Sequence, residues 1–130
     1  MPYKKYASEW LELAKHNLEA AEILINAGHY TDVIGLELQQ GIEKTLKSIF
    51  AYEGIRIEKT HDLVLLLKKV KNYIDIPAES YDICDIATTY YTEQRYPIVK
   101  NSLPPLNEIQ VVNQFAKDLF SLVWKIVCGE

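Results

Sequence analysis

The chain has 130 residues, 48% of them hydrophobic and 25% charged, and a formal net charge of −4. This length fits a single domain, residues 1–130, with enough apolar side chains for a core, and the charged fraction excludes global disorder. No apolar run reaches the roughly 18 residues of a membrane span, no signal-peptide pattern is present, and a net acidic chain is unlike a duplex-DNA binder, so we expect a cytoplasmic protein without membrane association.

Apolar residues recur at steps of three and four, the spacing of one helix face, in five segments of the chain. These segments run from about residue 4 to 27, 31 to 53, 61 to 73, 78 to 95 and 107 to 127. Glycines and prolines lie between them, and no alternating strand pattern is present. The sequence therefore predicts an all-α protein, an antiparallel bundle of four to five helices in one domain.

The apolar stripes also predict the core. In chain order the stripes are Leu11, Ala14, Leu18, Ala21 and Ile25; Ile34, Leu38, Ile42, Leu46, Ile49 and Phe50; Leu63, Leu66, Leu67 and Val70; Ile83, Ile86, Ala87, Tyr90 and Tyr91; and Ile109, Val112, Ala116, Leu119, Val123 and Ile126. Gly41 lies inside the second segment, where glycine costs about 1 kcal/mol relative to alanine, so we expect a neighbouring backbone to pack closely there. Thr60 is expected to cap the third helix, which is short and should lie across an end or side of the bundle.

The cysteines and histidines give no support to a metal site or a cofactor. Cys84 and Cys128 lie in apolar surroundings, which favours reduced, buried thiols. His16, His29 and His61 form no paired spacing on one helix, so a zinc site is not indicated. A glycine-rich phosphate loop and a nucleophile elbow are also absent from the sequence.

Charge is distributed unevenly. Residues 44–71 contain seven basic and three acidic side chains, whereas residues 75–93 contain five acidic side chains and no lysine or arginine. This pattern indicates either an anion-attracting patch beside an acidic patch or two solvated faces that partly neutralise each other. A row of four carboxylates shares one helix face but has no histidine at metal-binding spacing: Asp75, Glu79, Asp82 and Asp85.

Three tyrosines surround one arginine near the end of the fourth segment, in Tyr90-Tyr91-Thr92-Glu93-Gln94-Arg95-Tyr96-Pro97. Arginine can hold a phosphate through two parallel hydrogen bonds, and tyrosine rings can stack on exposed bases. The alternative is that the tyrosines pack within the bundle or a dimer, and that Arg95 caps the last carbonyls of the helix. Both interpretations remain open at this point.

Three blocks of the sequence, in order, resemble the HEPN family (higher eukaryotes and prokaryotes nucleotide-binding). Residues 39–47 are Gln-Gln-Gly-Ile-Glu-Lys-Thr-Leu-Lys, similar to the family's Q-x-x-x-E-K-x-x-K helix. Residues 59–63, Lys-Thr-His-Asp-Leu, resemble its T-H-D-L segment, and residues 91–97 resemble its Arg-Tyr-Pro helix end. The resemblance implies a helical bundle that commonly forms a homodimer.

It also implies association with nucleotide or RNA, and a minimal nucleotidyltransferase as partner in a pair of the toxin–antitoxin kind. Together with the charge pattern, it makes seven residues candidates for nucleotide or phosphate binding: Arg95, Tyr91, Tyr96, Lys100, Lys44, Lys47 and His61.

The sequence departs from the catalytic members of the family. For those members the resemblance implies a metal-independent ribonuclease motif, an arginine followed after four to six residues by a histidine. Counting from Arg95, those positions hold Lys100, Asn101 and Ser102, none of which replaces imidazole near neutral pH. We therefore expect a binding protein rather than an enzyme. Two alternatives stay open, a ribonuclease toxin that uses another base such as His61, and a non-catalytic helical dimer that acts as a scaffold.

Overall fold

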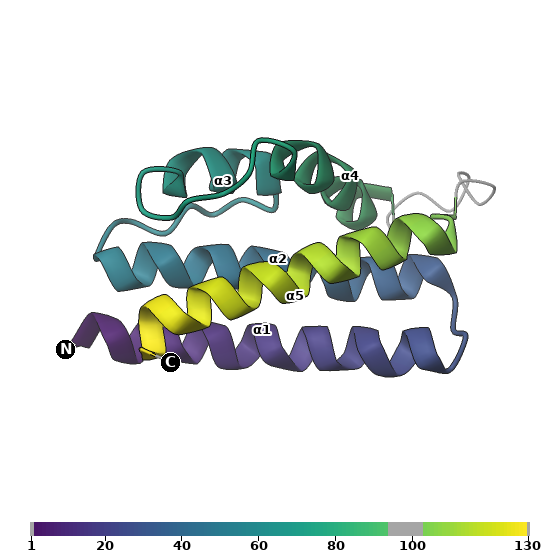
Figure 1. Ribbon diagram of the computed structural model, residues 1–130, viewed down its shortest axis with the longest axis horizontal. Helices are drawn as coiled ribbons and strands as arrows, with labels where there is room; N and C mark the ends of the chain where they lie inside the picture. Colours follow the sequence, from purple (N-terminus) through teal and green to yellow (C-terminus); the bar gives the residue numbers. More distant parts are fainter. Residues whose placement is uncertain (1, 94–102, 130) are drawn as a thin grey trace.

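In the computed structural model, the described residues form five α-helices (Figure 1). They are α1 (Pro2–Asn26), α2 (Thr31–Glu53), α3 (Leu63–Val70), α4 (Ser80–Glu93) and α5 (Leu106–Cys128). The structure describes the backbone of residues 2–93 and 103–129, and the side chains of residues 3–91 and 103–129. Strands are absent from these two ranges, so the predicted all-α bundle is confirmed.

The helices are arranged around α2, which contacts each of the other four. α1 runs antiparallel beside α2, and α5 crosses both of them obliquely (Figure 1). α3 and α4 follow one another along the remaining side of α2, as expected for a third helix too short to span the bundle. Because neighbours surround α2 so completely, most of its side chains are buried, including several that are polar or charged.

The predicted core stripes are confirmed in the second and third segments, where every member is buried. In the first and fifth segments the stripes are also buried, except that the terminal members Ile25 and Ile126 are only partly covered. The helical period therefore located most of the core correctly, because these helices bury one continuous face.

The predicted stripe of α4 is wrong in part. Ile86 is 38% exposed, and Ile83 and Tyr91 are only partly buried. Ala87 and Tyr90 are buried as predicted, and Ser80 and Cys84, which the stripe did not include, complete the buried face. Apart from Tyr90, whose ring lies against Gly35 of α2, the buried side chains are small, because α4 packs against both α2 and α3.

Two glycines of α2 mark positions where a neighbouring helix comes very close. A Cβ atom built on Gly41 lies 2.5 Å from Cδ2 of Leu18 and 3.6 Å from the Ala14 carbonyl oxygen, both on α1. The expected close packing at Gly41 is thus confirmed, although the nearest atoms belong to a side chain rather than the backbone. A Cβ atom on Gly35 similarly lies 2.9 Å from the Tyr90 ring of α4.

The third helix begins two residues later than the sequence predicts, and its cap is Asp62 rather than Thr60. The Asp62 carboxylate accepts hydrogen bonds from the backbone N–H groups of Val64 and Leu65. The Thr60 hydroxyl oxygen accepts instead from the backbone N–H of Asp62. These bonds satisfy N–H groups that have no partner within the helix and hold the residues before α3 in a defined conformation.

Candidate functional site

A line of polar residues crosses the buried face of α2. Gln39, Glu43 and Lys47 follow each other at steps of four, so they lie on one side of the helix. The Lys47 ammonium is 2.9 Å from Glu43 Oε2, and Gln39 Nε2 donates to Glu43 Oε1 at 3.0 Å. Buried charges are tolerated only when they are paired and hydrogen-bonded, and this network provides both.

His61 lies at the outer end of this network. Its Nδ1 is 2.8 Å from Glu43 Oε1, and its carbonyl oxygen accepts from Gln39 Nε2 at 3.1 Å. Its ring stacks on the ring of Tyr91 from α4, with centroids 4.1 Å apart and planes inclined by 24°. The His61 side chain nevertheless remains 49% exposed. One edge of the imidazole therefore contacts the buried carboxylate while the ring reaches the surface.

The charge of Glu43 determines the proton arrangement of His61. Burial raises the pKa of Glu43, but hydrogen bonds from Lys47, His61 and Gln39 outweigh it and hold the pKa below the ordinary value. An ionised carboxylate only accepts hydrogen bonds, so Nδ1 of His61 must carry the donated proton. Nε2 then becomes the ring atom that can accept a proton or, when protonated, donate to an anion.

The structure separates the candidate lysines. Lys47 is 8% exposed, is paired with Glu43, and lies 6.0 Å from the centroid of the Trp10 ring. Lys44 points to α1 instead, where its ammonium donates to Asn17 Oδ1 at 2.8 Å. Of the seven candidate residues, Lys47, His61 and Tyr91 thus belong to one network, and Lys44 lies apart from it.

Three further candidates, Arg95, Tyr96 and Lys100, lie outside the described residues. Along the sequence Arg95 follows Tyr91 by four residues. Their role in binding stays a prediction.

The acidic row and the two cysteines do not form a binding site. All four carboxylates of the acidic row are exposed. No group of three or more histidine, cysteine or acidic side chains is placed to hold a metal ion within the described parts of the chain. Cys84 and Cys128 are both free; Cys84 is buried as expected, whereas Cys128 is only partly covered.

Sequence reasoning used Gln39 and Glu43 only as parts of a motif and assigned them no contact. A signal was present, because polar residues at steps of four on an otherwise apolar helix indicate a buried network. The partner of Glu43 was not recoverable in the same way, since His61 lies 18 residues further along the chain.

The network draws on all three sequence blocks singled out above, and a wider comparison agrees with them. The HEPN domain family model matches residues 7–127. The chain belongs to the HEPN family.

Two solved structures share its fold at low sequence identity. One is the crystal structure of TT1696 from Thermus thermophilus, which is 24% identical in sequence and has a TM-score of 0.76. The similarity covers 92% of this chain and 96% of TT1696.

ST0689, an archaeal HEPN homologue, is 20% identical over 93% of this chain and 97% of its own, with a TM-score of 0.73. No curated protein matches the chain. Among the described residues of this HEPN chain, no helix is both long and apolar enough to cross a bilayer.

Proposed function

We propose that this HEPN protein binds a nucleotide or RNA through its phosphate groups at the surface formed by His61 and Tyr91, and that it works with a minimal nucleotidyltransferase in a pair of the toxin–antitoxin kind. One observation carries the proposal. Glu43 from the first family-like block, His61 from the second and Tyr91, the first residue of the third, meet in a single polar network that ends in a half-exposed imidazole.

The chemistry of this surface suits an anion. A protonated His61 donates from Nε2 to a phosphate oxygen, while Glu43 balances the charge at Nδ1. In this proposal Arg95 supplies a two-bond grip on phosphate, Lys100 adds positive charge, and Tyr96 offers a ring on which a base stacks. These three residues follow Tyr91 closely in the sequence.

The two lysines of α2 have different parts in this proposal. Lys47 supports the site from beneath, because its buried ammonium helps to keep Glu43 ionised. Lys44, held by Asn17, contributes positive potential rather than a direct contact.

Calorimetric titration with ATP and with a short single-stranded RNA tests the binding proposal. We expect His61→Ala and Arg95→Ala each to weaken binding by about tenfold, the equivalent of one hydrogen bond to a charged group. His16→Ala is the matched control, because His16 is exposed on α1 away from the network. No binding at millimolar ligand, or equal weakening by all three variants, contradicts the proposal and favours a scaffold instead.

Co-expression with a minimal nucleotidyltransferase from the same genome tests the partnership separately. We expect the two proteins to elute together in size-exclusion chromatography. Separate elution at micromolar concentration contradicts the partnership without affecting the nucleotide-binding proposal.

One observation favours a second candidate function, a metal-independent ribonuclease with His61 as general base. The bond from Nδ1 to Glu43 orients the imidazole, as a carboxylate does for a catalytic histidine. Nε2 then takes the proton of a ribose 2′-hydroxyl, and the 2′-oxygen attacks the adjacent phosphorus. Nε2 then passes this proton to the departing 5′-oxygen, giving a 2′,3′-cyclic phosphate and a 5′-hydroxyl end.

Incubation with RNA in EDTA distinguishes the two functions. The ribonuclease function requires cyclic-phosphate products that are lost in His61→Ala and Arg95→Ala but retained in His16→Ala. Equal cleavage by the wild type and both site variants shows a contaminating nuclease and rejects this candidate.

A further inference from the structure

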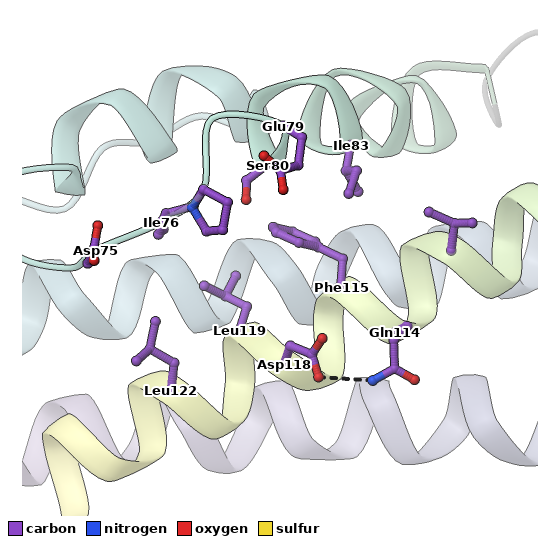
Figure 2. A pocket seen from close by; sticks show the side chains of 12 residues that line it. Asp75, Ile76, Glu79, Ser80, Ile83, Gln114, Phe115, Asp118, Leu119 and Leu122 are labelled. Carbon is purple, nitrogen blue, oxygen red and sulfur yellow. Dashed lines mark hydrogen bonds between the residues drawn. The ribbon is translucent and has the colours of Figure 1, made fainter.

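A groove lies on a different part of the molecule, between α5 and the segment that leads into α4 (Figure 2). Its volume is about 440 Å³. Apolar side chains make up most of both walls, with Ile76, Pro77 and Ile83 on one side and Val111, Phe115, Leu119 and Leu122 on the other. The residues that line the groove include neither His61 nor Tyr91, the two described residues that form the proposed nucleotide-binding surface.

The α5 wall is a second apolar stripe beside the one that enters the core. Val111, Phe115 and Leu122 recur at helical spacing, yet Val111 is 57% exposed and Leu122 is 36% exposed. Isolated exposed apolar residues are ordinary, but several in line along a groove indicate a surface that another molecule covers.

The rim of the groove is acidic. Asp75, Glu79 and Asp118 are exposed carboxylates, and the lining residues that the structure describes include neither lysine nor arginine. Gln114 donates to Asp118 Oδ1 at 2.9 Å, which orients that carboxylate beside the apolar stripe (Figure 2). The groove therefore combines apolar walls with negatively charged side chains along both sides of its rim.

We propose that this groove docks an amphipathic segment of a protein partner, with apolar side chains at helical spacing and lysine or arginine at its flanks. Charge complementarity selects a basic segment over a neutral or acidic one. The stripe from Val111 to Leu122 is about 16 Å long at 1.5 Å per residue. That length matches three turns of a helix, so a helical segment of a protein fits the groove better than a compact small molecule.

Fluorescence anisotropy with two labelled model peptides of equal length tests the proposal. One peptide combines leucine at helical spacing with lysine, and in the other every lysine is replaced by glutamate. We expect the leucine–lysine peptide to bind about tenfold more tightly at physiological salt, and the variant Glu79→Lys with Asp118→Lys to reverse this preference.

Two further variants separate specific docking from general attraction of opposite charges. The double variant Val111→Ser with Leu122→Ser changes positions that are already exposed. It should weaken binding of the leucine–lysine peptide by about tenfold, because the apolar contacts are lost. The matched charge control is Glu9→Lys with Glu12→Lys on α1, which should leave the preference unchanged. Circular dichroism confirms that each variant is folded.

Three results overturn the proposal. Equal effects of the groove and α1 charge reversals show that binding is non-specific. Groove-dependent NMR shifts with hexylamine, without peptide binding, assign the groove to a small apolar amine. A change of oligomeric mass in the serine variant, seen by sedimentation, assigns the groove to a second copy of this chain.

Discussion

Glu43 is the residue on which the polar network depends. Its carboxylate receives donors from Gln39, Lys47 and His61, so one side chain ties two turns of α2 to the segment before α3. Removing its charge leaves the buried Lys47 ammonium without a counter-ion, and an uncompensated buried charge strongly destabilises the folded state.

We predict that Glu43→Gln lowers the free energy of unfolding by about 2–4 kcal/mol at pH 7. The pKa of Glu43 in the fold lies below its ordinary value of 4.5, because the donors outweigh the effect of burial. The stabilisation is therefore complete above about pH 5 and is lost as the pH falls through the folded pKa.

Urea unfolding followed by circular dichroism from pH 7 to pH 3 measures this effect. The wild type and Glu43→Gln should converge at low pH, since both then lack the negative charge. Glu9→Gln, an exposed control on α1, should differ little from the wild type throughout. A difference between wild type and Glu43→Gln that stays constant over this range contradicts the prediction.

The two thiols should react very differently. Burial, reinforced by the negative charge of Asp62, raises the pKa of Cys84 to about 12. Cys128 is partly accessible near the end of α5. Since the thiolate is the reactive form, we predict that Ellman's reagent modifies Cys128 in the native protein and Cys84 only on unfolding. Cys128→Ser should leave almost no reactivity in the folded state, and rapid labelling of that variant would show the prediction to be wrong.

At the scale of elements, the contact between α1 and α2 is controlled by a small residue. Gly41→Ala places a methyl group against Leu18. Overpacking costs about 1–3 kcal/mol, which exceeds the gain of about 1 kcal/mol in helix propensity, so we predict a net destabilisation of about 1 kcal/mol.

A double-mutant cycle provides the control for this prediction. In a Leu18→Ala background the obstructing atoms are gone, and Gly41→Ala should become stabilising by about 1 kcal/mol. Chemical denaturation of the four proteins gives the coupling energy. The same sign of effect in both backgrounds would mean that the close contact has no energetic consequence.

The comparison of α2 with α4 shows which buried residues the spacing of apolar residues can predict and which it cannot. Every apolar member of the predicted stripe is buried in α2, because that helix is surrounded. In α4 the buried face includes Ser80 and Cys84 while Ile86 is exposed, since the tight contact with α2 and α3 selects small side chains. Periodicity predicts that a helix has a buried face, but the neighbours decide which residues form it.

At the scale of the whole molecule, the order and approximate length of the five helices were predictable from the spacing of apolar residues. The stacking of His61 on Tyr91 was not, because 30 residues separate them in the sequence and only the fold brings α4 beside the end of the network. The groove was also missed, since Val111 and Phe115 continue the apolar surface of α5 beyond the stripe that enters the core.

We predict that the chain forms a homodimer, as the family resemblance implies. Several large aromatic side chains are exposed, among them Tyr3, Tyr6 and Tyr30, and such residues are enriched at interfaces. Multi-angle light scattering should give twice the chain mass of 15.0 kDa. A monomer mass at the highest attainable concentration contradicts this expectation.

The short connection between α1 and α2 has a consequence for biosynthesis. These two helices share the most extensive contact in the molecule and occupy the first 53 residues. At about 5–20 residues per second the ribosome needs roughly 4 to 15 seconds to make residues 54–130, whereas helices form within microseconds. The nascent hairpin therefore exists for seconds with one side of α2 uncovered, and this interval is when the polypeptide is most vulnerable to aggregation.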